Sequence, residues 1–340
     1  MGWSKQMPKN PVVAVCGATG AVGREMLNVL EQRNFPACKV VAMASYRSAG
    51  KKLPFAGGAL EVIEMTPESF EGIDIALFSA GASVSKEMRQ HVVGAGAVMI
   101  DNSSAFRMED DVPLVVPEVN PQDIGWHSGV IANPNCSTIE MVVALKPLHD
   151  LGKIERVVVS TYQAASGAGA KAMDELYEQS REFLAGEELT INHFAHQIAF
   201  NTIPHIDKFL DDDYTKEEWK MVVETKKIMG DSSINVAPTC VRVPVLRCHA
   251  ESLNIEFANE VSPEDARRVL ENAPGVAVMD DPANNVYPMQ GLLANTDDVY
   301  VGRIRKDPTV EHGIALWLVM DQIRKGAALN AVQIAEMLIG

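Results

Sequence analysis

Short apolar runs alternate with segments of helical spacing over the first 135 residues. Four of the apolar runs predict buried strands, at 11–17, 39–45, 73–81 and 97–104. Helical spacing lies between them, at 21–33 and 84–93. Strands that are apolar along their whole length are buried on both faces, and their alternation with helices indicates a parallel, doubly wound sheet.

The pattern changes after residue 136. A long strand is predicted at 154–163, followed by a polar, partly helical stretch to about residue 235. Two longer antiparallel strands are expected at 241–257 and 299–307, and helical patterns at 313–324 and 328–339 close the chain. We therefore expect an α/β protein of two domains. The first is a Rossmann-type domain at 1–136, completed by a C-terminal helix at about 318–340, and the second is an α+β domain at 137–317.

Composition excludes several classes of partner. The 340-residue chain is 47% apolar and carries a net charge of −15, which disfavours nucleic acid and anionic membranes but not a small anionic substrate. The polar N-terminus shows no apolar signal core, and no apolar run reaches membrane-spanning length. The five cysteines are odd in number and form no C-x-x-C pair, so we expect a cytoplasmic protein without disulfides or a zinc site.

The glycine-rich segment GATGAVG follows the first predicted strand and opens the first predicted helix. Its glycines, Gly17, Gly20 and Gly23, let the backbone approach a pyrophosphate that the helix N-terminus then binds. A plain tight turn is the alternative. The position of the segment within a β-α-β unit favours a dinucleotide site.

The end of the second predicted strand indicates which dinucleotide is bound. No Asp or Glu lies between Lys39 and Lys52 to bind a ribose 2′-hydroxyl, whereas Ser45, Arg47 and Ser48 offer donors. These groups suit a 2′-phosphate and hence NADP, although a solvated basic loop would read the same way.

Cys136, in NPNCSTIE, lies where a strand-like run gives way to a helix-like run. Ser137 and Glu140 match a capping box, which predicts that Cys136 lies one residue outside a helix N-terminus. The helix dipole and free N–H groups there stabilise a thiolate, so Cys136 is a candidate nucleophile, with a small buried hydrophobe as the alternative. A dinucleotide fold with such a cysteine suggests reduction of a thioester, which also needs an acid/base and anion-binding groups.

Several longer motifs occur in order along nearly the whole chain: NPNCST, TYQAASGAG, NTIPHID, EEWKMVVETKKI, VAPTCVRVPVLRCHA and GAALNAVQIAE. Together they resemble the aspartate-β-semialdehyde dehydrogenase family. The resemblance implies an oxidoreductase that reduces L-aspartyl-4-phosphate with NADPH to aspartate semialdehyde and phosphate. This reaction serves lysine, threonine, methionine and diaminopimelate biosynthesis. The resemblance also implies a glyceraldehyde-3-phosphate-dehydrogenase-like fold and a homodimer.

The resemblance assigns roles to individual residues. Cys136 matches the nucleophile, Gln163 the residue that orients the substrate, and His249 the acid/base. Substrate groups are matched by five residues: Arg242 for the carboxylate, Glu217 for the amine, Lys220 and Arg107 for phosphate, and Asn135. Cofactor contacts are matched by Gly17, Thr19, Gly20, Ala21, Val22, Gly23, Ser45, Arg47, Ser48, Ser166, Gly167 and Gln322. No metal is implied.

Some features leave alternatives open. Arg242 and His249 are seven residues apart and would face opposite sides of one ideal strand, so their pairing rests on the resemblance alone. His193, His196 and His205 are expected to pack in the polar stretch or at a dimer interface rather than to bind metal. The rival functions are another acyl-phosphate reductase, similar to N-acetylglutamyl-phosphate reductase, and an inactive nucleotide-binding relative.

Overall fold

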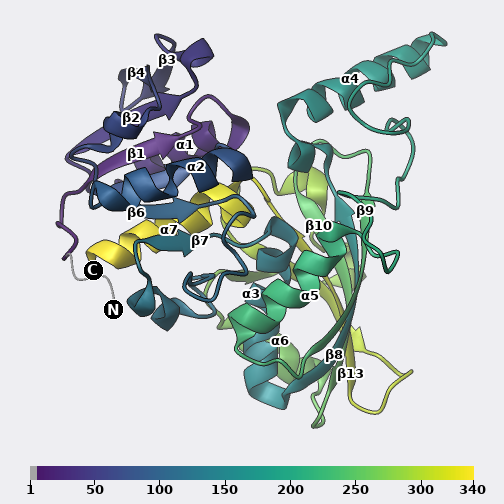
Figure 1. The fold of residues 1–340 in the computed structure, drawn as a ribbon. Coiled ribbons are helices and arrows are strands. Elements are labelled where there is room, and N and C mark those ends of the chain that lie inside the picture. Colours follow the sequence, from purple (N-terminus) through teal and green to yellow (C-terminus); the bar gives the residue numbers. More distant parts are fainter. Residues whose placement is uncertain (1–5) are drawn as a thin grey trace. The chain divides into compact units, whose positions relative to one another are not determined.

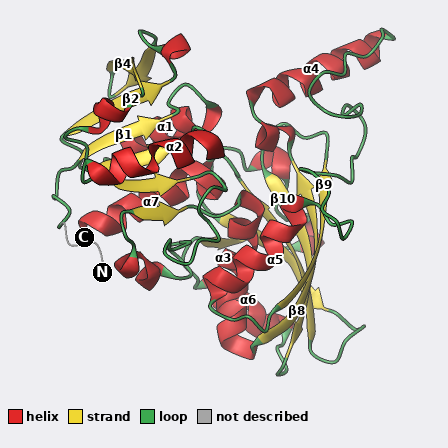
Figure 2. Cartoon of the chain, in the orientation of Figure 1, coloured by secondary structure: helices red, strands yellow, loops and turns green. Residues whose placement is uncertain are grey.

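The computed structural model describes residues 6–340. The chain divides into two compact units, one formed by residues 1–135 and 326–340 and the other by residues 136–325. Helices and strands both occur in each unit (Figure 2). The first unit is therefore discontinuous in sequence, whereas the second is a single continuous segment.

The first unit is built on a seven-stranded sheet of order β3-β4-β2-β1-β5-β6-β7, in which all neighbours are parallel except β3 and β4. Its strands are β1 (Val12–Cys16), β2 (Lys39–Ala44), β3 (Lys52–Phe55), β4 (Gly58–Glu64), β5 (Ile75–Phe78), β6 (Val98–Asp101) and β7 (Val130–Ala132). Its helices are α1 (Ala21–Gln32), α2 (Ala82–Gly94) and α7 (Leu329–Ile339).

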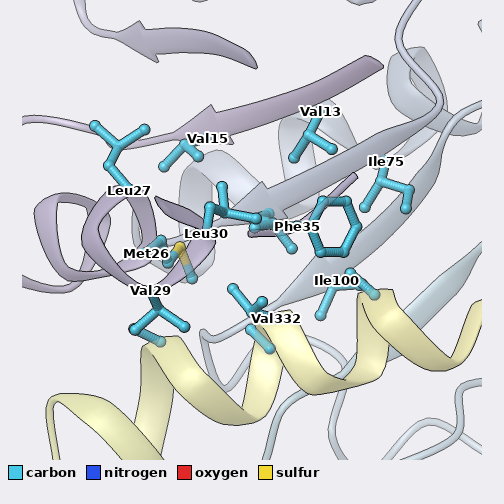
Figure 3. Close-up of a cluster of buried hydrophobic side chains, with 14 of the residues drawn as sticks. Val13, Val15, Met26, Leu27, Val29, Leu30, Phe35, Ile75, Ile100 and Val332 are labelled. Atoms are coloured by element: carbon cyan, nitrogen blue, oxygen red, sulfur yellow. The ribbon is translucent and has the colours of Figure 1, made fainter. Parts of the chain in front are cut away.

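The core of this unit joins the two ends of the chain (Figure 3). Val13 and Val15 of β1 pack with Leu30 of α1, and Val332 of α7 belongs to the same cluster. All four side chains are at most 3% exposed. Apolar residues at helical spacing on α1 and on α7 thus cover one buried sheet face, which is why the last helix is part of the first unit.

The second unit is built on a six-stranded mixed sheet of order β11-β12-β13-β10-β8-β9. Its strands are β8 (Ile154–Gln163), β9 (Asn235–Arg242), β10 (His249–Phe257), β11 (Val276–Val278), β12 (Val299–Lys306) and β13 (Gly313–Met320). Its helices are α3 (Cys136–Gly152), α4 (Ala170–Ala185), α5 (Lys216–Met229) and α6 (Pro263–Glu271), and a π-helical turn at Arg324–Ala328 leads into α7.

Burial alternates along the central strands of this sheet. On β10, Leu253 and Ile255 are fully buried while Asn254 between them is exposed. Within the second unit, α3, α5 and α6 lie along the sheet (Figure 1), and α3 contacts β8 and β10 while α5 contacts β9. The period-2 pattern therefore gives each strand one face beneath helices and one face without them.

Two predictions about the second half of the chain are wrong. Residues 313–320 form a strand and not a helix, because GIALWLVM is buried between β10 and β12 and pairs with both. Residues 241–257 do not form one strand. β9 ends at Arg242 and runs parallel to β8, and β10 begins at His249 and runs antiparallel to β8 on its other side.

The β3–β4 hairpin has no counterpart in the predicted elements, because LPF and the charged strand GALEVIE lack a long apolar run. Within residues 6–340, no helix combines the length and the apolar character that crossing a lipid bilayer requires.

Candidate active site

Cys136 is the first residue of α3, and its side chain is partly exposed. The predicted capping box does not form. The Ser137 hydroxyl accepts a hydrogen bond from Gln163, and both Glu140 carboxylate oxygens are buried without a hydrogen-bond partner among residues 6–340. The helix therefore starts one residue earlier than predicted, and Cys136 lies in its first turn, where free backbone N–H groups point outward.

Three of the predicted site residues lie in one row across the second sheet. Gln163 of β8 pairs in register with Arg242 of β9, and Tyr162 pairs with Ala250, which places His249 of β10 on the other side of Gln163. All three side chains are at most 7% exposed. Arg242 and His249 lie on the same face because they belong to two strands with β8 between them. This arrangement accounts for the seven-residue spacing that one strand could not explain.

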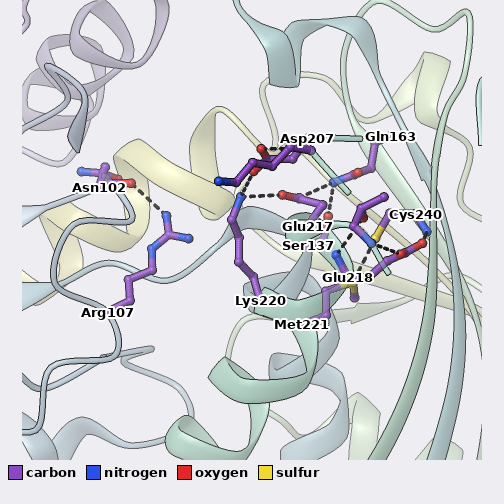
Figure 4. Close-up of polar contacts among 12 residues, drawn as sticks. Asn102, Arg107, Ser137, Gln163, Asp207, Glu217, Glu218, Lys220, Met221 and Cys240 are labelled. Carbon is purple, nitrogen blue, oxygen red and sulfur yellow. Dashed lines mark hydrogen bonds and ion pairs between the residues drawn. The ribbon is translucent and has the colours of Figure 1, made fainter. Parts of the chain in front are cut away.

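A polar network runs from this row to α5 (Figure 4). Gln163 Nε2 donates to Ser137 Oγ, and also to Glu217 Oε1 at 3.1 Å. Glu217 Oε2 accepts from Lys220 Nζ at 2.9 Å, and Lys220 Nζ donates to Asp207 Oδ2 at 2.8 Å. The predicted amine binder and one predicted phosphate binder are thus ion-paired with each other.

Lys220 and Asp207 stay charged within this network. Burial lowers the pKa of Lys220, but the carboxylates of Glu217 and Asp207 outweigh burial and raise it. The pKa of Asp207 is lowered, since its bonds to Lys220 outweigh the effect of burial. Asp207 is absent from the sequence-based predictions. It lies 13 residues from Lys220 at the end of the motif NTIPHID, but the resemblance gave it no role.

His249 has a defined orientation and protonation. Its Nδ1 accepts a hydrogen bond from the Ala164 N–H at 3.1 Å, which leaves the proton of the neutral ring on Nε2. Nε2 has no hydrogen-bond partner among residues 6–340. Burial, together with the charge of Arg242, lowers the pKa of His249 to about 3. The ring is therefore neutral at physiological pH, with a buried N–H that can donate to a ligand.

The backbone before His249 is strained. Cys248 has φ 72, and its N–H donates to Gln322 Oε1 at 2.9 Å while its carbonyl accepts from Gln290 Nε2 at 2.7 Å. Left-handed geometry at a non-glycine residue persists where the surroundings hold it. These two amides fix the turn that directs His249 into β10, and no sequence pattern pointed to Cys248 or Gln290.

Gly167 lies against the row formed by Gln163, Arg242 and His249. A Cβ at this position would be 2.9 Å from Arg242 Nη1 and 3.1 Å from His249 Nε2, which leaves no room for a side chain. The same turn holds Arg242, because Arg242 Nη1 donates to the Ala164 carbonyl at 2.6 Å. Ser166, a neighbour of Gly167, accepts from Gln322 Nε2. Three of the predicted cofactor contacts, Ser166, Gly167 and Gln322, therefore lie together in the second unit.

Two predicted substrate residues belong to the first unit. Arg107 is 8% exposed, and its guanidinium donates to the carbonyls of Asn133 and Asn102, each at 2.9 Å. Asn135 ends the first of the two segments that form the first unit and is buried just before α3. Two backbone oxygens therefore orient the Arg107 guanidinium, a group that suits an anionic ligand.

The remaining predicted cofactor residues surround the start of α1. Gly17 has φ 85, and a Cβ there would lie 2.3 Å from the Ser79 carbonyl oxygen. A Cβ at Gly23 would lie 2.2 Å from the Gly17 carbonyl oxygen. Only glycine fits at these two positions, as expected where a tight turn brings the backbone close to a pyrophosphate. Ala21 and Val22 lie in the first turn of α1, as does Gly23.

A cavity in the first unit, about 540 Å³ in volume, extends from this turn to the end of β2. Its lining includes four further predicted residues, Thr19, Gly20, Ser45 and Arg47, and Ser48 lies in the same short 3-10 turn as Arg47. Glu64 also lines this cavity and was missed. It lies outside the 39–52 segment, and only the parallel pairing of β4 with β2 places it beside Ala44. The residues of this unit fit a dinucleotide.

The histidines of the polar stretch have other partners. His193 Nε2 lies 3.2 Å from the Ala168 carbonyl, and His205 stacks on Phe209 with ring centroids 4.4 Å apart. In the part of the chain that the structure describes, no group of three or more His, Cys, Asp or Glu side chains is arranged to hold a metal ion.

This arrangement suits acyl transfer to a thiol. Cys136 is close enough to Arg242 for its charge to affect the pKa of Arg242. The sheet row beside it carries the buried N–H donor of His249 and the amide of Gln163. That amide contacts the Glu217 carboxylate, which is paired with the Lys220 ammonium group. Such a set can bind an anionic, amine-bearing acyl compound and donate a hydrogen bond to its reacting carbonyl.

Comparison with known proteins agrees with this chemistry. Two family models match, described as "Semialdehyde dehydrogenase, NAD binding domain" over residues 12–127 and "Semialdehyde dehydrogenase, dimerisation domain" over residues 145–325. The chain is 58% identical over 331 residues to the aspartate-semialdehyde dehydrogenase of Aquifex aeolicus, covering 96% of this chain and 97% of that protein.

Two solved structures are also similar. The aspartate semialdehyde dehydrogenase II of Vibrio cholerae complexed with ASA is 47% identical, with a TM-score of 0.94 and 99% of both chains covered. The aspartate semialdehyde dehydrogenase of Candida albicans with NADP is 28% identical, with a TM-score of 0.75, covering 97% of this chain and 98% of that one.

Proposed function

Because the chain belongs to the aspartate-semialdehyde dehydrogenase family, we propose that Cys136 carries the acyl group of its substrate as a thioester. The protein is an aspartate-semialdehyde dehydrogenase by activity, an oxidoreductase of aspartate-family amino-acid biosynthesis with an NAD(P)-binding domain and a dimerisation domain. The observation that carries the proposal is the position of Cys136 in the first turn of α3, near Arg242.

The proposed reaction begins on L-aspartyl-4-phosphate. The Cys136 thiolate attacks the acyl carbon, so that a C–S bond forms and the bond from carbon to the phosphate oxygen breaks. A bound reduced nicotinamide supplies the hydride that reduces the thioester. His249 Nε2–H donates a hydrogen bond to the substrate oxygen as negative charge develops on it. The C–S bond then breaks, which restores the carbonyl, releases the aldehyde and returns Cys136 to the thiolate.

The remaining side chains bind the ends of the substrate. Arg242 offers a guanidinium to the α-carboxylate, and Glu217 offers a carboxylate to the amine. Lys220 and Arg107 are assigned to phosphate, Gln163 orients the acyl group, and Asn135 is assigned to substrate binding. Glu217 and Lys220 bind each other at 2.9 Å in the structure. This assignment therefore requires that their ion pair be replaced by contacts to the substrate when it binds.

The finer cofactor assignment is NADP. It is supported by Arg47 and Ser45 in the lining of the cavity, since a guanidinium suits a 2′-phosphate. The relative from Candida albicans was solved with NADP. Glu64, in the same lining, is the group that would favour NAD instead. We also assign the protein to the cytoplasm, in keeping with five cysteines that form no disulfide among residues 6–340.

The test is phosphate-dependent reduction of NADP by aspartate semialdehyde, followed by nicotinamide absorbance. Cys136→Ala should lower kcat by at least about 100-fold, and Cys136→Ser nearly as much, because a hydroxyl is a poor nucleophile without a strong base. The matched control is Cys38→Ala, since Cys38 is exposed and outside the site. Activity above a few per cent in Cys136→Ala would remove Cys136 from the mechanism.

The same assay tests the cofactor. Arg47→Glu should raise the KM for NADP about tenfold or more, because it replaces a charge-assisted bond by repulsion, and should leave the KM for NAD nearly unchanged. Equal losses with both cofactors would contradict the assignment of Arg47 to the 2′-phosphate.

A further inference from the structure

Two buried carboxyl groups of the second unit have no part in the mechanism above. Glu140 of α3 and Glu251 of β10 are both 0% exposed. None of their four side-chain oxygens has a hydrogen-bond partner among residues 6–340. Buried ionised carboxylates without partners are too costly to persist, so these groups need a proton, a ligand or each other.

The two groups are neighbours. The charge of Glu140 acts on the pKa of Glu251, and burial of each group raises its pKa well above the ordinary value. α3 and β10 are in contact, and α3 also contacts β8, β12 and β13. The strand neighbours of Glu251 are Thr161 on β8 and Leu318 on β13, neither of which is ionisable.

Their spacing relates them to the reacting groups. Glu140 follows Cys136 by four residues, so both lie on one face of α3. Glu251 follows His249 by two residues, so both lie on one face of β10. Glu140 thus lies one helical turn after Cys136, and Glu251 lies two residues after His249. The carboxyl pair therefore joins the two elements that carry the nucleophile and the acid/base.

We propose that Glu140 and Glu251 form a buried carboxyl pair that keeps at least one proton at neutral pH, and that this pair positions Cys136 against His249 by joining α3 to β10. A protonated carboxyl donates a hydrogen bond to its partner, which satisfies both groups without a cation. Neither group is assigned to the substrate above, so both are proposed as positioning residues. The proposal rests on the function proposed above only for its kinetic test.

The other ionisable groups near the pair favour its protonated form. Glu217 on α5 raises the pKa of Glu251, and Glu140 raises the pKa of Cys248, the residue before β10. Glu251 likewise raises the pKa of Cys240 on β9, together with Glu217 and Glu218 of α5. Arg247, beside Cys248, is paired with Asp321 at 2.8 Å. Negative or neutral groups therefore dominate around the pair.

The first measurement detects the proton without using activity. The infrared spectrum of the intact protein at pH 7 should contain a protonated-carboxyl band that is lost in the double variant Glu140→Gln/Glu251→Gln. Wild type should also take up about one proton more than the double variant on folding at pH 7, because the unfolded carboxyls are ionised. The contribution of the pair to stability should fall as pH rises above about 4.5. The same infrared band and pH slope in the double variant would overturn the shared proton.

The second measurement tests positioning. Glu140→Gln keeps a donor for Glu251 and should retain kcat within about threefold, whereas Glu140→Leu leaves Glu251 without a donor and should lower kcat at least about tenfold at nearly unchanged KM. The activity of wild type should decline reversibly at alkaline pH as the pair ionises, and Glu140→Gln should move this decline to higher pH. The matched control is Glu256→Gln, on β10 but partly exposed, which should change neither.

If Glu140→Leu does not fold, Glu251→Gln provides a second test. Its amide donates to Glu140, so this variant should keep kcat near the wild-type value and move the alkaline decline in activity to higher pH, as Glu140→Gln does. Wild-type kcat and pH profile in folded Glu140→Leu, or an unchanged alkaline limb in both glutamine variants, would overturn the positioning role. Loss of Cys136 from the mechanism would leave the infrared result standing, so the two proposals fail separately.

Discussion

At the scale of single residues, His249 shows how burial selects a protonation state. Its ring is fully buried, it accepts the Ala164 N–H, and the guanidinium of Arg242 is near. Each of these features disfavours the imidazolium, and together they lower the pKa of His249 to about 3. The residue therefore enters the reaction as a neutral donor, and its folded form resists protonation.

The lowered pKa of His249 predicts acid sensitivity. Unfolded histidine protonates below about 6.5, whereas the folded ring stays neutral down to about 3, so this contribution to stability is lost as pH falls through that window. Between pH 7 and pH 5 the loss is about 2 kcal/mol. His249→Asn keeps an acceptor for the Ala164 N–H but cannot protonate, and its free energy of unfolding should fall less over this range.

Urea unfolding of both proteins at pH 7 and pH 5 measures this difference. Parallel losses in wild type and His249→Asn would mean that the ring is protonated in the folded protein at pH 5, contrary to the expectation.

Sequence reasoning at this scale identified chemistry better than geometry. Cys136 beside a predicted helix start pointed to thiol chemistry, and the resemblance added Gln163, Arg242 and His249, but the predicted capping box was wrong. Ser137 uses its hydroxyl for Gln163, 26 residues away, and Glu140 faces the buried interior. Local spacing cannot show that a distant side chain competes for a cap.

At the scale of elements, the flanking of β8 by β9 and β10 organises the site. One parallel and one antiparallel neighbour bring Arg242 and His249 to either side of Gln163, although the chain between them makes an irregular turn at 243–248. Glu217 and Lys220 come instead from the first turns of α5, whose capping box at Thr215 and Glu218 does form. Arg242 thus comes from a strand, whereas Glu217 and Lys220 come from a helix.

This division predicts separable kinetic effects. Arg242→Ala, on β9, should raise the KM for aspartate semialdehyde at least about tenfold with a smaller effect on phosphate, since a buried charge-assisted contact is lost. Lys220→Ala and Arg107→Ala should do the opposite in the phosphate-dependent direction. Arg242→Lys should not rescue, because a point charge cannot form a bidentate contact.

Initial-rate measurements with each substrate varied in turn separate the two classes, and Lys226→Ala, at the far end of α5, is the control. Identical profiles for the Arg242 and Lys220 variants would show that the charges are assigned to the wrong groups.

The elements themselves were predictable where apolar runs are long and flanked by turns, as for β1, β2, β5, β6 and β8. Each of the errors has a physical cause. An apolar segment such as 313–320 reads alike as a buried strand or a buried helix, and only its pairing with β10 and β12 decides. The β3–β4 hairpin, with its polar strands, gave no such signal.

At the scale of the whole molecule, the second unit has a sheet face that its helices do not cover. Tyr162 and Trp317 lie on this face with ring centroids 5.1 Å apart, and Ser252 of the central strand pairs in register with Trp317. The dimerisation-domain match extends over these strands. We propose that two copies of this chain associate through this face.

Ser252→Arg tests this arrangement, because it places a charge at the centre of the proposed interface. Light scattering should give the mass of two 36.9 kDa chains for wild type and a reduced mass for Ser252→Arg. Asn28→Arg, exposed on α1, is the control and should remain dimeric. A dimeric Ser252→Arg, or a monomeric wild type, would contradict the proposal.

The discontinuity of the first unit has a consequence for the order in which a newly made chain can fold. Val332, Ile334 and Ala335 of α7 belong to the core of a unit whose other residues are the first to be synthesised. The ribosome therefore finishes the second unit, residues 136–325, before the first has its last helix. The first unit therefore cannot complete its core before the second is synthesised, and the part of its apolar core that α7 covers stays open to water until residues 329–339 leave the ribosome.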